Sequence, residues 1–107
     1  VNRNRLTAQE WKDWGYRQIW EIASVRANDV HPAMFPIQLA SRVIKLYTDE
    51  GDVVLDPFLG SGTTAIAAIK LNRKFIGIEK VKKYYEIAFN SIKEAQYEAE
   101  NNLFANI

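Results

Sequence analysis

One segment constrains the fold of this chain more than any other: residues 56–64, with the sequence DPFLGSGTT. It follows the apolar run at residues 53–55, which is typical of a strand buried on both faces of a parallel sheet. Gly60 and Gly62 allow a tight turn and a close approach of ligand to backbone, because neither carries a Cβ atom. The helix predicted at residues 63–71 begins with N–H groups that face this loop. Because ligands of open α/β sheets bind at the carboxyl ends of strands, the pattern predicts a binding site here.

The remaining periodicity predicts an α/β domain. A helix beginning at Pro36 is expected to carry one apolar face, formed by Ile37, Ala40, Val43, Ile44 and Tyr47. A second buried strand is expected at residues 75–78, and a long helix from Lys82 carries Tyr85, Ala88, Ile92, Ala95 and Ala99 on one face. This order predicts a βαβ unit with a right-handed crossover. Two strands alone leave open edges and apolar faces, so we predict a Rossmann-like fold with an incomplete sheet that needs further polypeptide.

The first thirty residues differ in character from the rest, because they contain all three tryptophans. Residues 7–10 fit a capping box, and Trp11 and Trp14 then share one helical face. We expect the tryptophans to pack against a missing part of the protein, with stacking on bases as the alternative. The chain is therefore divided into a Trp-containing N-terminal segment, 1–30, and a ligand-binding βαβ part, 31–107.

Composition excludes several classes of site. The 107 residues contain no cysteine, which excludes a disulfide scaffold and a thiolate metal site and favours a cytoplasmic location. The single histidine, His31, argues against a histidine-rich metal site and against a Ser-His-Asp triad, so no metal site is expected. No apolar run approaches membrane-spanning length, and no membrane association is expected. The net charge of +1 leaves DNA binding open.

Glu79 is the second candidate ligand-binding residue, because it directly follows the second predicted strand. A carboxylate there accepts hydrogen bonds from both hydroxyls of a ribose, although a solvated strand end is the simpler interpretation. A P-loop needs lysine after its second glycine, and Thr63 stands there, which disfavours an NTPase. Gly60, Gly62 and Ala65 match a dinucleotide fingerprint that does not start at the strand end, so a nicotinamide-dependent (NAD) oxidoreductase remains an alternative.

Three motifs together resemble those of one enzyme family. Residues 56–64 and the sequence FIGIE at residues 75–79 resemble the cofactor-binding motifs of the DNA adenine-N6 and cytosine-N4 methyltransferases. The sequence HPAMFPIQL at residues 31–39 is similar to the motif that precedes them in a permuted class, whose cofactor motifs lie at the C-terminus. The resemblance implies an S-adenosylmethionine-dependent methyltransferase fold and a cofactor site formed by Phe35, Pro36, Asp56, Pro57, Phe58, Gly60, Ser61, Gly62, Thr63, Thr64, Ile78 and Glu79.

The resemblance also implies a role for each part of this site. The loop glycines would shape the backbone around the methionine part of S-adenosylmethionine, and Asp56 and the paired threonines would hydrogen-bond its amino and carboxylate groups. Glu79 would hold the ribose, and Ile78 would pack on the adenine. Phe35 and Pro36 would close the pocket, although starting a helix and filling the core explains these two residues equally well.

The chain lacks the motif with which this family holds the target amino group, an Asp, Asn or Ser followed by Pro-Pro and an aromatic residue. Residues 56–58 lack the second proline, so no residue is assigned as catalytic. The resemblance implies methylation of adenine N6 or cytosine N4 in DNA, with the catalytic motif on a missing segment or a second polypeptide. A non-catalytic S-adenosylmethionine-binding regulatory module is a further alternative.

Two short basic clusters bear on DNA contact. One follows Glu79 and consists of Lys80, Lys82 and Lys83, and the other precedes the second predicted strand and consists of Arg73 and Lys74. Both are candidates for phosphate contacts, although basic side chains at an element end are more often simply solvated.

Overall fold

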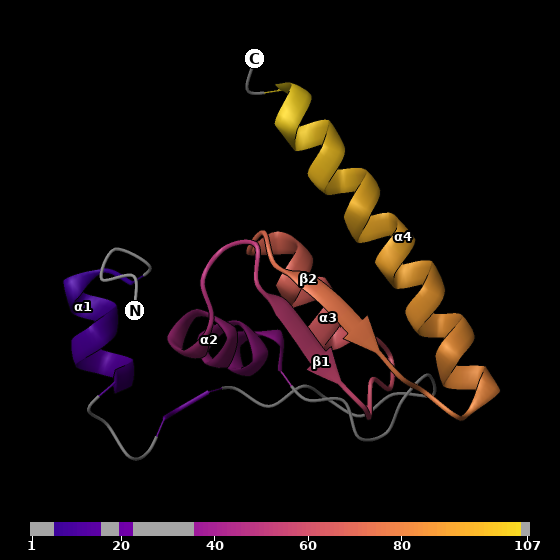
Figure 1. The fold of residues 1–107 in the computed structure, drawn as a ribbon, viewed down its shortest axis with the longest axis horizontal. Coiled ribbons are helices and arrows are strands. Elements are labelled where there is room, and N and C mark those ends of the chain that lie inside the picture. The colour runs from indigo at the N-terminus through magenta and orange to yellow at the C-terminus, as the bar shows by residue number, and fades with distance from the viewer. Residues whose placement is uncertain (1–5, 16–19, 23–35, 106–107) are drawn as a thin grey trace.

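The structure, a computed structural model, describes residues 6–15, 20–22 and 36–105. In chain order the elements are α1 (Ala8–Glu10), the π-helical turn η1 (Trp11–Gly15), α2 (Ile37–Tyr47), β1 (Val53–Asp56), α3 (Thr63–Lys70), β2 (Lys74–Gly77) and α4 (Lys82–Ala105) (Figure 1). The predicted order of elements is confirmed. Within the described ranges, no helix has the length and apolar character needed to cross a membrane.

β1 and β2 form a parallel two-stranded sheet, and α3 connects them. The register runs from Val53 opposite Lys74 to Asp56 opposite Gly77. β2 begins and ends one residue earlier than predicted, within the usual uncertainty of a strand end. The βαβ unit predicted from the apolar runs and the glycine loop is therefore present.

The hydrophobic core lies on one face of this sheet, where α3 packs between α2 and α4 (Figure 1). Its centre is made of alanines on α3, because their small side chains let the neighbouring helices and the sheet approach closely. One cluster joins α2 to α3 through Ala40, Ile44, Ala67 and Ala68. The other joins the glycine loop to α3 and α4 through Leu59, Ala65 and Ala88. Phe75 of β2 packs against both clusters.

The opposite face of the sheet is open in the described part of the chain. Val53 and Leu55 of β1, Ile76 of β2 and the adjoining Ile78 are each more than half exposed. The prediction that both strands are buried on two faces is therefore wrong for these residues, because the helices that pack on the sheet lie on one side only. Four large exposed apolar side chains on and beside these two neighbouring strands agree with the prediction that the sheet is incomplete within this chain.

The two amphipathic helices bury narrower faces than their periodicity suggests. On α2 the buried side chains are Ala40, Ile44 and Leu46, whereas Ile37, Val43 and Tyr47 are exposed. On α4 the buried side chains are Ala88 and Ala95, and the remainder of the predicted face is only partly covered. For α4 the reason is length, since α3 has eight residues and α4 has 24, so α4 extends beyond the helix it packs against.

The N-terminal segment begins with the predicted capping box, in which the Glu10 N–H donates to Thr7 Oγ1 and the Thr7 N–H donates to Glu10 Oε1, both at 3.0 Å. The Arg42 guanidinium of α2 lies 5.1 Å from the Trp14 ring centre and 5.7 Å from that of Trp20. Trp14 and Trp20 therefore pack on the chain's own α2, which corrects the prediction that they pack on a missing part.

Glu10 adds an ion pair to this contact, because its Oε2 lies 2.8 Å from Lys45 Nζ on α2. Partial burial raises the pKa of Glu10, but hydrogen bonds from Lys45 and Thr7 and the charge of Lys45 together hold that pKa below its ordinary value of 4.5.

Candidate functional site

The glycine loop is fixed against the end of β2 by backbone hydrogen bonds. The Ile78 N–H donates to the Asp56 carbonyl oxygen, and the Leu59 N–H donates to the Ile78 carbonyl oxygen, both at 3.0 Å. These bonds extend the strand pairing by one step and then turn the chain toward α3. The carboxyl ends of both strands and the N-terminus of α3 therefore meet at one edge of the sheet, as predicted.

The two loop glycines adopt backbone conformations that suit glycine. Gly60 has φ of 60° and Gly62, the N-cap residue of α3, has φ of 97°. A Cβ atom on Gly62 would also lie 3.3 Å from the backbone Cα of Ala88 on α4. Glycine at 62 is thus favoured by its backbone conformation, and the absence of a Cβ atom lets α4 pack closely behind the loop.

Leu59 anchors the loop, and sequence reasoning missed its role. Its side chain is buried against Ala65 and Ala88, and its Cδ2 atom would lie 2.6 Å from a Cβ atom on Gly77. β2 therefore needs a glycine directly beneath the loop. The available signal was Gly77 itself, because a glycine within a strand often marks a close approach of another segment.

Two carboxylates complete this edge. The Glu79 side chain accepts the Gly60 N–H at Oε2, at 2.8 Å, and the Val81 N–H at Oε1, at 3.0 Å. The Asp56 side chain accepts the Phe58 N–H at Oδ1, at 2.9 Å, as an Asx-type turn. Each carboxylate thus holds the loop backbone in place.

The structure brings together eight of the twelve predicted cofactor residues: Asp56, Gly60, Ser61, Gly62, Thr63, Thr64, Ile78 and Glu79. Pro57 and Phe58 are exposed, and Phe58 is 84% accessible, so within the described chain neither residue is part of a closed pocket. Pro36 is the half-buried N-cap residue of α2 and stands just outside the first turn. Phe35 and His31 lie outside the described residues.

The buried and half-buried groups at this edge define what it can bind. Ser61 and Thr63 are buried hydroxyl-bearing residues at the start of α3, where a helix presents unpaired N–H groups to an acceptor. Asp56 and Glu79 provide negative charge on either side of the loop. The arrangement suits a ligand that carries an anionic group, a cationic group and a pair of hydroxyls.

One residue of the two basic clusters, Arg73, differs from the others in burial. Arg73 is buried, and its guanidinium donates to the Thr48 carbonyl oxygen, to Thr48 Oγ1 and to the Leu71 carbonyl oxygen. It is a structural residue, so the expectation that it is a candidate phosphate contact is wrong. The lysines at positions 74, 80, 82 and 83 are exposed, as the simpler interpretation requires.

Comparison with known proteins connects this geometry to a family. Residues 2–90 match the family model described as DNA methylase. Type II methyltransferase M.BglI of Bacillus subtilis is 52% identical over 93 residues, which are 87% of this chain and 27% of M.BglI.

Solved structures give the same result. TTHA0409 from Thermus thermophilus, determined in complex with S-adenosyl-L-methionine, superposes with a TM-score of 0.67 at 36% identity, over 85% of this chain and 34% of that one. The cytosine-N4-specific PvuII DNA methyltransferase superposes with a TM-score of 0.57 at 25% identity, over 75% of this chain and 36% of that one. The predicted incomplete Rossmann-like α/β fold is confirmed, and the chain spans only 27–36% of the length of these proteins.

Proposed function

The chain belongs to this family of DNA methylases, and on that premise we propose that it binds S-adenosylmethionine for methyl transfer to adenine N6 or cytosine N4 in DNA. The observation that carries the proposal is the hydrogen bond between the Gly60 N–H and Glu79 Oε2, at 2.8 Å. It joins the glycine loop of one strand to the carboxylate of the next, at the edge of the sheet where ligands of this fold class bind.

The residues at this edge fit the parts of S-adenosylmethionine. Asp56 is a suitable acceptor for the ammonium group, and Thr63, Thr64 and the N-terminus of α3 provide donors for the carboxylate. Glu79 is a suitable acceptor for the ribose hydroxyls, and Ile78 supplies an apolar surface beside it. Gly62 lets α4 pack closely behind the loop, because a Cβ atom there would lie 3.3 Å from the Cα and Cβ atoms of Ala88.

In this mechanism the chain performs one part of the reaction, which is to hold the methyl donor in position. The bound cofactor supplies an activated methyl group on a positively charged sulfur. The loop and Glu79 would fix the position of the methyl donor. This positioning favours direct attack by the target amino nitrogen, because the two reacting groups are already aligned. The target base must leave the DNA stack to reach this edge, and polar groups at its amino nitrogen would stabilise the transition state.

We also propose that the groups that hold the target base lie outside this chain. The Pro-Pro motif is absent from its sequence, and the apolar face formed by Val53, Leu55, Ile76 and Ile78 is open. A missing segment or a second polypeptide would supply the catalytic motif and cover this face, so methylation by the chain alone is not expected. DNA is the proposed substrate of the complete enzyme.

The comparisons do not support the alternative functions. M.BglI and the PvuII enzyme are both DNA methyltransferases, and neither is an oxidoreductase or a regulatory module.

Calorimetric titration of the chain with S-adenosylmethionine tests the cofactor proposal. We expect saturable binding, and a loss of roughly ten- to a hundredfold in affinity in Glu79→Ala, because charge-assisted hydrogen bonds to the ribose are removed. Glu98→Ala is the matched control, since Glu98 is an exposed carboxylate on α4 and should leave the affinity unchanged. Circular dichroism melts of each variant separate lost binding from lost folding.

Two outcomes would contradict the proposal. One is unchanged affinity in a folded Glu79→Ala variant, and the other is tighter binding of NAD than of S-adenosylmethionine. If the folded chain binds neither ligand, the same titration with the catalytic part restored decides whether the pocket is shared between the two parts.

A further inference from the structure

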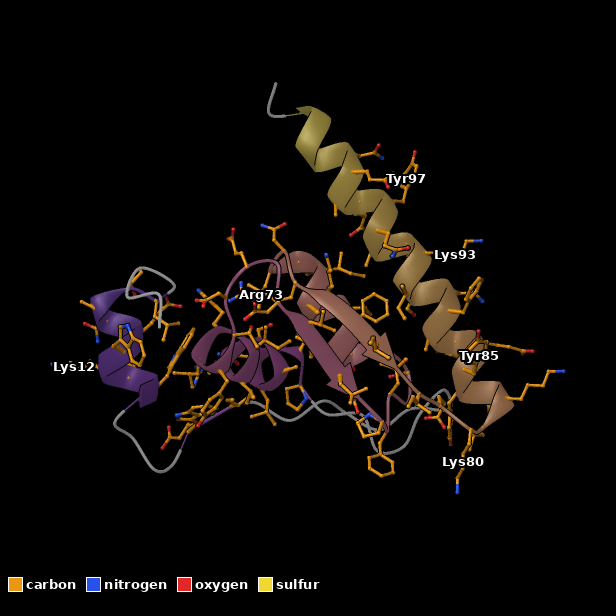
Figure 2. All side chains as sticks on the ribbon, in the orientation of Figure 1. Lys12, Arg73, Lys80, Tyr85, Lys93 and Tyr97 are labelled. Carbon is orange, nitrogen blue, oxygen red and sulfur yellow. The ribbon has the colours of Figure 1, made fainter. Side chains whose placement is uncertain are left out.

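The Glu79 carboxylate is held from two sides at the carboxyl end of β2. Its Oε2 atom accepts the Gly60 N–H at 2.8 Å, and its Oε1 atom accepts the Val81 N–H at 3.0 Å. Figure 2 shows the neighbouring Lys80 at this end of the sheet, far from Arg73 at the other end. Because each oxygen has its own backbone donor, the two hydrogen bonds set the direction in which the carboxylate faces.

The position of the Gly60 N–H depends on the residue before it, Leu59. The Leu59 N–H donates to the Ile78 carbonyl oxygen at 3.0 Å, and the Leu59 carbonyl oxygen accepts the Gly62 N–H at 3.1 Å. Leu59 is thus joined to the end of β2 on one side and to the N-cap residue of α3 on the other. A shift of its backbone must move the Gly60 N–H, since consecutive Cα atoms are only about 3.8 Å apart.

The Leu59 side chain fits a space that a glycine leaves in β2. It is 7% exposed and packs against Ala65 of α3 and Ala88 of α4. A Cβ atom on Gly77 would lie 2.6 Å from Leu59 Cδ2 and 3.0 Å from Leu59 Cδ1, so both branches of the leucine approach the strand closely. Close packing against two helices and a strand leaves this side chain, and the backbone that carries it, little freedom to shift.

We propose that Leu59 is a positioning residue for Glu79. Its packing over Gly77 fixes the Gly60 N–H, and that N–H fixes the direction in which the Glu79 carboxylate meets the ribose of S-adenosylmethionine. The inference rests on the proposed function, because it takes the ribose as the group that Glu79 binds. Leu59 is buried, so it acts through the backbone and not by contact with the ligand. Binding groups must be held to within about 0.5 Å of their productive geometry, so a buried leucine can control affinity.

A leucine that only filled the core would lower stability and leave the carboxylate as it is. Ile44 provides the comparison, because it is 4% exposed and lies in the other core cluster, between α2 and α3. Loss of either side chain leaves a cavity and destabilises the fold. Of the two residues, only Leu59 directly precedes a donor to Glu79, so only its loss should change how that carboxylate is held.

A double-mutant cycle between Leu59 and Glu79 first tests the proposal without ligand. Its four proteins are the wild type, Leu59→Ala, Glu79→Ala and the variant with both changes, and the amide proton resonance of Gly60 reports on its hydrogen bond. In the wild type, Glu79→Ala should move this resonance strongly, because a carboxylate acceptor is lost. In Leu59→Ala the same change should move it much less, because the N–H is already displaced. The Val81 resonance is the internal control and should respond in both backgrounds.

Calorimetric titration of the same four proteins with S-adenosylmethionine is the second measurement. Leu59→Ala is expected to weaken binding about tenfold, because the carboxylate is no longer aligned. It should have no further effect once Glu79 is alanine, since the two residues act as one unit. Leu59→Met keeps the volume of the side chain and should bind as the wild type does. Ile44→Ala is the matched control, and it should leave both the Gly60 resonance and the affinity unchanged.

The results separate this proposal from the proposed function. An equal response of the Gly60 resonance in both backgrounds, or losses of affinity that simply add, would overturn the role of Leu59 and leave the cofactor site standing. Unchanged affinity in Glu79→Ala would contradict the cofactor site, whereas the amide measurement would still decide whether Leu59 places the Gly60 N–H. Circular dichroism checks that each variant is folded, and Leu59→Val, a milder truncation, replaces Leu59→Ala in the cycle if that variant does not fold.

Discussion

Two charged side chains hold the backbone at opposite ends of the sheet, and they do so with opposite chemistry. At the carboxyl end, the half-buried Glu79 accepts N–H groups from the glycine loop and from the segment leading into α4. At the amino end, Arg73 is 7% exposed and donates to the carbonyl oxygens of Thr48 and Leu71, each at 2.7 Å. The first group lies where two strands and a helix N-terminus meet, whereas the second is enclosed by the chain.

The difference shows how a structural charge is told from a functional one. Each of the three nitrogens of the Arg73 guanidinium donates a hydrogen bond to the backbone or to Thr48 Oγ1, and the residue is largely buried. The Glu79 carboxylate accepts N–H groups at the carboxyl edge of the sheet, where ligands of this fold class bind, and the residue is only half-buried. In sequence the two residues look alike, because each is a charged residue next to a strand.

The largest effect is expected from Arg73→Ala, which should lower the free energy of unfolding by about 3 kcal/mol. The reason is that the carbonyl oxygens of Thr48 and Leu71 and the hydroxyl of Thr48 all lose their charged donor. Urea unfolding of the two proteins followed by circular dichroism measures the difference. Glu79→Gln is the matched comparison and should cost less than about 1 kcal/mol, since that side chain is partly solvated. Equal losses in the two variants would remove the distinction between the two ends.

A smaller loss, about 2 kcal/mol, is expected from Gly77→Ala, which tests how tightly the carboxyl end is packed. The added methyl group would lie 2.6 Å from Leu59 Cδ2, so the loop anchor must shift. The same substitution made in a Leu59→Ala background should cost much less, because the clashing atoms are gone. Unfolding measurements on the four proteins of this double-mutant cycle give the coupling. Additive losses would mean that Gly77 serves some purpose other than making room for Leu59.

Much of the fold could be predicted from local pattern. The apolar run before DPFLGSGTT, the helix after it and the second apolar run predict the βαβ unit to within one residue, because each element is determined by short-range preferences. Burial could not be predicted in the same way. Leu55 and Ile76 have the composition of doubly buried strands, yet their faces are open, because burial depends on polypeptide that lies elsewhere.

The residues of the candidate site also fall into two groups, those that local pattern could predict and those that it could not. Glycines 60 and 62 and Glu79 could be predicted because their function depends on residue type and on position relative to a strand end. The role of Leu59 against Gly77, and the burial of Arg73, could not, because both depend on contacts between segments that sequence spacing does not reveal. The cation–π contacts of Arg42 with Trp14 and Trp20 belong to the same category.

The smallest effect is expected at Glu10, a charged side chain that joins two segments while remaining partly exposed. Its folded-state pKa lies below the ordinary value of 4.5, so its contribution to stability is present above that value and is lost as pH falls through the folded pKa. Glu10→Gln keeps the capping geometry but removes the charge that pairs with Lys45. We expect it to cost less than about 1 kcal/mol at pH 7 and progressively less below pH 4.5, as thermal melts across this range would show. A difference that stays constant down to pH 3 or so would mean that packing and not charge makes this contact.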